Sequence, residues 1–226
     1  MTWNLDPPPG FQGLHPDKPV TMYQRHLPHW RQAGATYFVT FRLADSLPRD
    51  KLDELISFRA DWDRRHPPPR SEQQLHELWR ETFLRIDRWL DEGAGSCRLR
   101  DPRASKTVTD SLHYFDGQRY ELGCYVVMPN HVHLVVRPFE EDDEALGRIM
   151  HSWKRHTSFE INKLFGLEGA LWQDESYDRI VRDEEHLWRT IQYIGRNPKK
   201  AGLTNANGTT WIRPSWIELG WKFIDL

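Results

Sequence analysis

The chain has 226 residues, enough for one domain with a substantial hydrophobic core. Its 31 basic and 33 acidic residues nearly cancel, which excludes a histone-like polycation but leaves room for a local basic patch. No apolar run approaches the length of about 18 residues that a membrane helix needs. The N-terminus lacks a secretory signal pattern, and two cysteines cannot build a disulfide framework. We therefore expect a reduced, soluble, cytoplasmic protein.

The first half of the chain predicts an extended segment, a strand and a set of helices. Residues 1–19 are rich in proline and form an extended lead-in. Residues 36–43 are β-branched and aromatic, as in a strand. From Asp50 the apolar spacing becomes helical, a proline run at 67–69 interrupts it, and a second helical stripe continues to Gly93.

The second half predicts three strands and three helices in a defined order. Their expected positions are a short helix at 105–114, strands at 119–127 and 131–136 joined through Pro129, a long helix at 146–166, a strand at 176–182, and a last helix from 183 to 197 that Pro198 ends.

This order indicates an α+β protein with a ferredoxin-like split βαβ fold. The helices before residue 115 are taken as one enlarged first crossover, and the crossover helices are expected on one face of an antiparallel sheet. The last helix follows the final strand. The predicted organisation is a lead-in at 1–19, one domain at 20–205 and a Trp-rich extension at 206–226.

The first candidate site is the pair His131 and His133 on the predicted strand. Side chains at positions i and i+2 of a strand point to the same face, so both imidazoles project together. Two imidazoles held this way can share one metal ion. The alternative is a strand with an exposed face that carries two histidines without a function. Polar rings on an otherwise apolar strand, however, need a hydrogen-bonding or metal partner.

The second candidate is Tyr193 with Asn197. They lie four residues apart on the last predicted helix, hence on one face, at the border of its apolar stripe. The alternative is a tyrosine that packs sideways and an asparagine that caps the helix before Pro198.

Clusters of basic residues lie beside these candidates in the sequence. They suit an anionic partner, although each cluster could equally be solvated surface. The residues expected to bind DNA are Arg148, Lys154 and Arg155 on the long helix, and Arg196, Lys199 and Lys200 at the end of the last one.

Three sequence blocks together resemble the REP-associated tyrosine transposases, which are single-tyrosine HUH transposases with an IS200-like transposase domain. The blocks span about residues 20 to 205 in family order. They are YFVTFRL from Tyr37, VVMPNHVHLVV from Val126, and YIGRNPKKAGL from Tyr193.

The resemblance implies an HUH domain that cuts and rejoins single-stranded DNA at hairpin-forming, REP-like repeats. It makes His131 and His133 the metal ligands and Tyr193 the nucleophile that forms a 5′-phosphotyrosine. Asn197 stands where the wider family often has a glutamine, so it is the expected third ligand. The implied cofactor is a divalent ion, Mg²⁺ or Mn²⁺, and Mn²⁺ suits nitrogen ligands better.

Several alternatives stay open at this point. The chain could be a hairpin-binding regulator with weak chemistry, or a structural or metal-storing protein. Tyr177 is a rival nucleophile that lacks an asparagine four residues later. The tryptophans of the tail could pack on the domain or contact DNA. The protein could act as a monomer or as a homodimer that exchanges its tyrosine helix.

Overall fold

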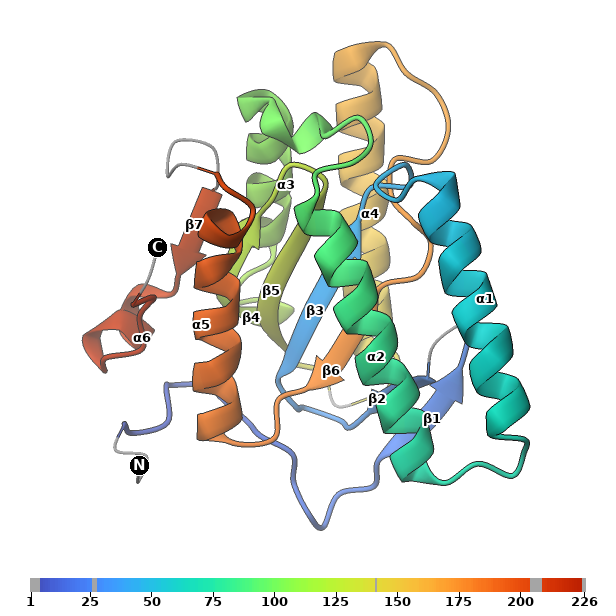
Figure 1. The fold of residues 1–226 in the computed structure, drawn as a ribbon. Coiled ribbons are helices and arrows are strands. Elements are labelled where there is room, and N and C mark those ends of the chain that lie inside the picture. The colour runs from blue at the N-terminus through green and yellow to red at the C-terminus, as the bar shows by residue number, and fades with distance from the viewer. Residues whose placement is uncertain (1–4, 26–27, 141, 204–208, 225–226) are drawn as a thin grey trace.

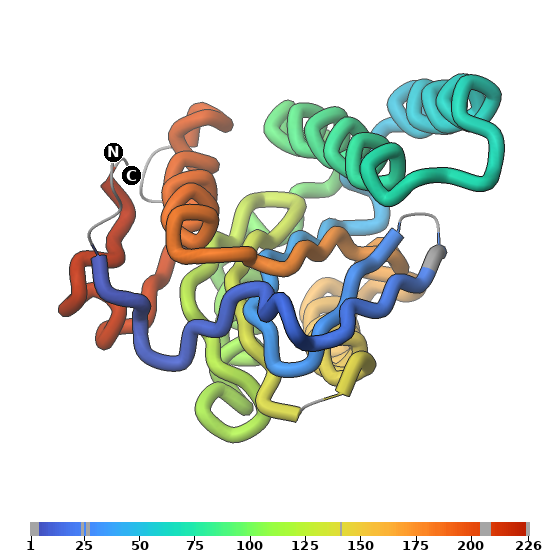
Figure 2. Tube along the Cα trace, turned by 90° about the horizontal axis from the view of Figure 1, so that it is seen from below, coloured from blue at the N-terminus to red at the C-terminus, as the bar shows by residue number. Residues whose placement is uncertain are grey.

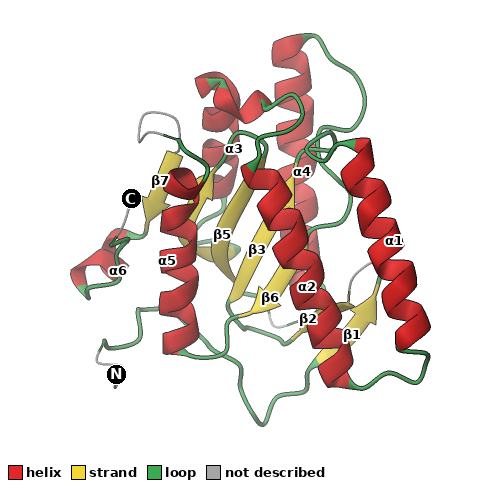
Figure 3. Cartoon of the chain, viewed as in Figure 1, coloured by secondary structure: helices red, strands yellow, loops and turns green. Residues whose placement is uncertain are grey.

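The computed structural model describes residues 5–25, 28–140, 142–203 and 209–224. Parts of the predicted lead-in (1–4) and tail (206–208 and 225–226) lie outside these ranges, as does Glu141. The strands and helices shown in Figure 3 are β1 (Thr21–Gln24), β2 (Pro28–Arg31), β3 (Tyr37–Arg42), α1 (Arg49–Arg65), α2 (Glu72–Asp91), a 3-10 turn (Arg98–Arg100), α3 (Pro102–Tyr114), β4 (Tyr120–Val127), β5 (His131–Pro138), α4 (Ala145–Phe165), β6 (Tyr177–Ile180), α5 (Glu184–Lys200), β7 (Thr209–Ile212) and α6 (Pro214–Glu218).

The main sheet has five strands in the spatial order β6-β3-β5-β4-β7, and every neighbouring pair is antiparallel. The first four strands, counted along the chain from β3, therefore have the order 4-1-3-2 of a split βαβ fold. This confirms the predicted ferredoxin-like arrangement, and β7 extends it at one edge. The central pair, β3 and β5, sets the register that matters for the site: Thr40 lies opposite His133.

The helices cover both faces of the sheet. Helices α3 and α4 pack against each other on one face, whereas α2 and α5 cover the other, with α1 outside α2 (Figures 1 and 2). The prediction that the whole first crossover lies on one face is therefore wrong. The reason is the aromatic stripe of α2: Phe83 packs on Phe38 of β3 and stacks on Tyr177 of β6, on the face opposite α3.

Helix α5 runs one turn further than predicted. Pro198 lies inside the helix, which continues to Lys200. A proline in the last turn removes only one amide donor, and the following turn is closed by the amide of Ala201 donating to the carbonyl of Asn197 at 3.0 Å. The extra turn places Lys200 on the same side of the helix as Tyr193 and Asn197.

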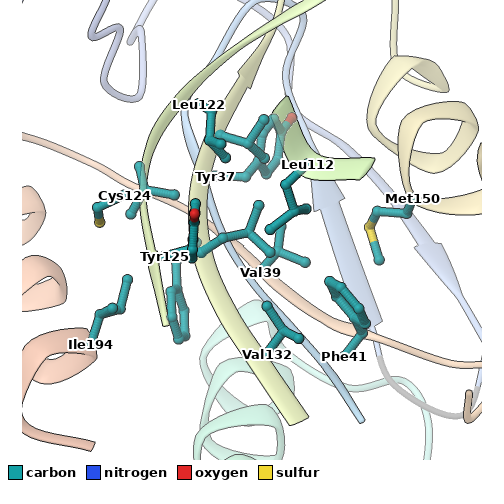
Figure 4. Packing of buried hydrophobic residues seen from close by; sticks show 14 of the residues in the cluster. Tyr37, Val39, Phe41, Leu112, Leu122, Cys124, Tyr125, Val132, Met150 and Ile194 are labelled. Carbon is teal, nitrogen blue, oxygen red and sulfur yellow. The ribbon is translucent and has the colours of Figure 1, made fainter. Parts of the chain in front are cut away.

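The core fills the sheet interior on both sides. Val39, Phe41 and Val132 point toward α3 and α4, where they meet Leu112 and Met150 (Figure 4). On the other side of the sheet, Ile194 of α5 packs over β4 (Figure 4). Alternating strand side chains thus serve two separate helical layers, which explains why β4 and β5 are apolar nearly throughout.

The described part of the tail packs on the domain. Strand β7 pairs with β4, and the indoles of Trp216 and Trp221 are buried, each donating to a backbone carbonyl of the lead-in, at Pro9 and Asp6. A Cβ atom at Gly123 would lie 2.3 Å from the Trp216 ring, so glycine is what allows this indole to approach the strand so closely. Trp211 stacks on Tyr125.

Neither cysteine forms a disulfide; Cys97 and Cys124 are both free and buried. Among the described helices, none is long and apolar enough to cross a bilayer.

A small hairpin of β1 and β2, absent from the predicted elements, is tied to β6 by a buried charge cluster. Asp178 of β6 accepts from Arg31 at 2.9 Å and from the ring of His29 at 2.8 Å, and His29 also contacts Glu175 at 3.2 Å. Burial alone lowers the pKa of His29, but its hydrogen bonds to Asp178 and Glu175 outweigh that effect and raise the pKa to about 9. The charged imidazolium is therefore the form that the fold stabilises.

This cluster predicts a specific pH dependence of stability. Because the folded pKa of His29 lies above its unfolded value, the stabilisation is fully present below pH about 6.5 and is lost as the pH rises toward 9. The difference in unfolding free energy between the wild type and His29→Gln should shrink over this window, by at most about 1.4 kcal/mol per pH unit. Urea unfolding at several pH values measures it, and a constant difference would contradict the charged assignment.

Candidate active site at the histidine pair

His131 and His133 project side by side from β5 toward the face that carries α5. Both side chains are fully buried, and their Nε2 atoms lie 3.0 Å apart. The alternation of the strand produces this arrangement, as the sequence predicts. Two ring nitrogens so close must either share a proton or hold a cation between them.

Asn130 and Thr40 fix the orientation of the two rings. The Asn130 amide donates to the carbonyls of Leu90 and Ala94, so its Oδ1 is left to accept from His131 Nδ1 at 2.8 Å. His131 then carries its proton on Nδ1 and presents a lone pair at Nε2. Thr40 Oγ1 lies 2.7 Å from His133 Nδ1 and fixes the orientation of that ring, while its hydroxyl can either donate to this nitrogen or accept from it. Such partners are what metal-binding histidines in proteins need.

Burial keeps both rings neutral. It lowers the pKa of His131 well below its ordinary value, and the neighbouring His133 adds to the effect. Burial also lowers the pKa of His133 to about 3, helped by the nearby Lys200 ammonium. Neutral imidazole is the form that binds metal, so the pair does not need to lose protons before it can act as a ligand.

Tyr193 of α5 lies over the histidine pair of its own chain. Its hydroxyl is 3.5 Å from His133 Nε2 and donates a very short hydrogen bond to Asp87 Oδ1 of α2. The phenol ring also makes an edge contact with Phe38. Burial, followed by the charge of Asp87, raises the pKa of Tyr193 far above its ordinary value. The phenol is therefore protonated, with a carboxylate already in place at its proton.

Asn197 lies beside both groups, one turn after Tyr193. Its amide nitrogen donates to the Tyr193 carbonyl at 2.7 Å, whereas its buried Oδ1 has no hydrogen-bond partner among the described residues. The side chain also lies within hydrogen-bonding reach of both neighbours, where it raises the pKa of His133 and lowers the pKa of Tyr193, although larger effects outweigh it at each residue. A buried oxygen without a donor is costly unless something binds it, so this atom is available to a ligand.

The spacing of the two histidines matches the ligand spacing of a divalent ion. Adjacent ligands of an octahedral ion, each about 2.1 Å from it, are about 3.0 Å apart, which is the separation of the two Nε2 atoms. Asn197 Oδ1 offers the oxygen. No cluster of three or more His, Cys, Asp or Glu side chains with metal-binding geometry occurs in the part of the chain that the structure describes. An amide would therefore have to complete the protein's share of the coordination.

Lys200 connects the end of α5 to two carboxylates of α2. Its ammonium lies 2.9 Å from Asp87 Oδ2 and 2.5 Å from Asp91 Oδ2, while the two carboxylate side chains are only 4% and 11% exposed. Burial opposes the charged form of Lys200, but these two carboxylates raise its pKa overall. Lys200 thus balances the charge of the carboxylate that holds the tyrosine.

Tyr177, the rival nucleophile, is placed differently. It is buried on β6, where its ring stacks on Trp79 and Phe83 with centroids 4.0 Å apart in each pair. Burial raises its pKa well above the ordinary value. No hydrogen bond or ring contact links it to either histidine among the described residues, so the geometry favours Tyr193.

The predicted basic residues divide into two groups. Lys200 is in the site, and Arg196 and Lys199 are exposed on the same last turns of α5. By contrast, α4 lies on the opposite face of the sheet (Figure 2). On that helix, Arg148 pairs with Glu140 and Asp142, Lys154 donates to the carbonyls of Gln173 and Asp174, and Arg155 is exposed. The structure does not bring the α4 group to the histidines.

Two polar residues of the site escape sequence reasoning in different ways. Asn130 directly precedes His131, and an amide next to a histidine pair is a signal that could have been used. Asp87 lies 106 residues before Tyr193, in a helix whose polar face carries many other charges. Nothing in the local pattern separates Asp87 from those other charges.

These features define an α+β protein in which an antiparallel sheet presents a neutral histidine pair to a partly buried tyrosine. A curated protein of Haemophilus influenzae (strain ATCC 51907 / DSM 11121 / KW20 / Rd), named a REP-associated tyrosine transposase, is 28% identical over 116 residues. The match covers 44% of this chain and 66% of that protein, slightly less than two thirds of its length. It confirms the resemblance that the three sequence blocks indicate.

Other comparisons add little. No protein-family model matches the chain. A solved structure of a REP-associated tyrosine transposase bound to a REP hairpin covers 81% of this chain and 76% of its own, with 18% identity and a TM-score of 0.38. Because this score is low, the fold assignment depends on the strand order described above.

The contact between Lys200 and the α2 carboxylates predicts a stability difference between two adjacent lysines. Lys200→Met leaves Asp87 and Asp91 without their cation, and should lower the unfolding free energy by about 1–2 kcal/mol, because the ammonium is half exposed and partly screened. Lys199→Met removes an exposed charge and should change it by less than about 0.5 kcal/mol. Urea unfolding compares them, and equal effects would contradict the proposed ion pairs.

Proposed function

We propose that the protein is a metal-dependent endonuclease and strand transferase that acts on single-stranded DNA at hairpin-forming, REP-like repeats. The observation that carries the proposal is Tyr193 lying over two neutral, oriented histidines of the same chain. The family resemblance and the Haemophilus influenzae relative support DNA as the substrate. Arg196 and Lys199, exposed beside Tyr193, suit a phosphate backbone. The free cysteines suit the reducing cytoplasm, where genomic DNA is found.

His131, His133 and Asn197 would hold the divalent ion. When bound, it withdraws charge from the scissile phosphate, which lowers the barrier to attack on phosphorus. The residues of the chain have three further tasks: to aim the nucleophile, to take its proton and to keep water from the tyrosine. Burial of Tyr193 between α2 and β5 serves the first and the last of these tasks.

Asp87 is the acceptor for the phenol proton. Tyr193 Oη already donates to Asp87 Oδ1, and Lys200 on the second carboxylate oxygen holds the acceptor in position. As Oη bonds to phosphorus, its proton passes to Asp87 Oδ1 and the bond from phosphorus to the 3′ oxygen breaks. Asp87 then passes this proton to the leaving 3′ oxygen, so the products are a 5′-phosphotyrosine on Tyr193, an Asp87 carboxylate and a strand that ends in a 3′-OH. The phosphotyrosine conserves the bond energy, so a later 3′-OH can reverse the step.

The nucleophile assignment predicts the outcome of a two-variant experiment. With Mn²⁺ and a labelled single-stranded hairpin oligonucleotide, Tyr193→Phe should form no covalent adduct on a denaturing gel, while its dissociation constant for the strand changes less than about threefold, because only one hydroxyl is lost. The matched variant Tyr177→Phe should still form the adduct. Tight binding without an adduct in the wild type, under any divalent metal, would indicate a hairpin-binding regulator instead.

The proton-acceptor assignment predicts a loss of rate without a loss of binding. Asp87→Asn keeps the shape of the side chain but cannot take the proton, and should slow adduct formation by about 10²- to 10⁴-fold. Asp91→Asn is the control, because Asp91 contacts the same lysine but accepts no hydrogen bond from Tyr193 in the described structure. Quenched time courses at saturating DNA give both rates. An Asp87→Asn rate equal to that of the control would remove Asp87 from the mechanism.

A further inference from the structure

A pocket of about 460 Å³ opens between the α1–α2 hairpin and the sheet, next to the tyrosine site. Two of the residues that line it already belong to that site: Thr40 contacts His133, and Asp87 contacts Tyr193. A strand with its scissile phosphate at Tyr193 would therefore bring a neighbouring nucleotide to the pocket mouth. The proposed function gives the pocket no role.

The walls of the pocket are largely apolar and partly aromatic. Helix α1 contributes Leu52 and Ile56, which are 37% and 66% exposed, and Phe83 of α2 and Tyr177 of β6 line the inner side. Exposed apolar side chains of this kind favour contact with a flat, uncharged ring over contact with water.

Two hydroxyls in the pocket lack a partner, and two guanidinium groups also line it. The hydroxyls of Thr82 and Ser176, residues only 2% and 7% exposed, have no hydrogen-bond partner in the described structure. Arg42 is 9% exposed and donates to Ser46 Oγ at 3.0 Å, and the negative charge of Glu175 acts on both Arg42 and Arg59. Burial lowers the pKa of Arg42 to about 10, which still leaves it charged at neutral pH.

A nucleotide combines the two chemistries that this pocket offers. Its base is flat and carries polar edges for the hydroxyls, and its phosphate is an anion for the two guanidinium groups. The pocket is reachable only by an unpaired base, because a base inside a duplex is stacked and paired.

We propose that this pocket receives the unpaired base of a nucleotide adjacent to the scissile phosphate, with Arg42 and Arg59 facing its backbone phosphate. This inference rests on the proposed function, since it takes the strand cut at Tyr193 as the ligand. The pocket then helps to choose which nucleotide is placed at the cut.

The first test removes bases from the DNA. The Tyr193→Phe protein, which cannot cleave, is titrated with a labelled single-stranded hairpin oligonucleotide, and the dissociation constant is measured by fluorescence anisotropy. An abasic nucleotide is then introduced at each position around the cleavage site in turn. One position next to the scissile phosphate should weaken binding about tenfold, because stacking of one base contributes about 1–3 kcal/mol. A strand that binds but loses less than twofold at every position would overturn the proposal.

The second test fills the pocket from the protein side. Ala60→Trp adds a ring at an exposed position of α1 that lines the pocket, and Ser57→Trp adds the same ring at an exposed position that does not. Both changes are at the surface and leave the core intact. In the Tyr193→Phe background, Ala60→Trp should weaken binding of the intact strand about tenfold and abolish the abasic effect. Ser57→Trp should change neither quantity.

The outcomes separate the two proposals. If the wild type forms its covalent adduct but Ala60→Trp and Ser57→Trp bind the strand equally, the pocket assignment is wrong and the enzyme assignment stands. If the wild type neither binds the strand nor forms an adduct, both proposals fall. An abasic effect that survives in Ala60→Trp would show that the base is read elsewhere.

Discussion

The candidate site depends on two imidazole nitrogens, His131 Nε2 and His133 Nε2, that face each other at 3.0 Å on one side of the sheet. Both rings are buried and neutral, and Asn130 fixes the proton of His131 on the far nitrogen. The lone pair of His131 therefore points at His133, an arrangement that a shared proton or a bound cation must relieve. Asn197, whose oxygen has no hydrogen-bond partner among the described residues, and the hydroxyl of Tyr193 lie beside this pair. The proposed cleavage of DNA uses this one arrangement of two histidines, an amide oxygen and a tyrosine hydroxyl.

Sequence periodicity predicts the centre of the site well, because its residues are close neighbours along two regular elements. His131 and His133 share a face by strand alternation, and Tyr193 and Asn197 share a face by helical spacing. The antiparallel strand order also follows from the succession of elements. One local error, ending α5 at Pro198, hid the contact of Lys200 with the carboxylates of α2, because the added turn carries its ammonium to them.

The contribution of the α1–α2 hairpin was not predictable in the same way. Its apolar stripes predict two helices, but not the face of the sheet on which they lie. That face is decided by long-range packing of Phe83 on Phe38 and Tyr177. Only this packing brings Asp87 to the Tyr193 hydroxyl and encloses the pocket beside it. The sequence marks the histidine pair and the proposed nucleophile, whereas only the tertiary structure supplies the proposed proton acceptor and the proposed base pocket.

The most direct test of the central claim is to identify the residue that becomes attached to DNA. The wild-type protein is incubated with Mn²⁺ and a single-stranded hairpin oligonucleotide, the adduct is digested with nuclease and protease, and the peptides are sequenced by mass spectrometry. The account predicts a 5′-phosphodeoxynucleotide on Tyr193, in the peptide that also contains Asn197. A modified Tyr177, with Tyr193 unmodified, would contradict the assignment of the histidine pair and Tyr193 as one active site.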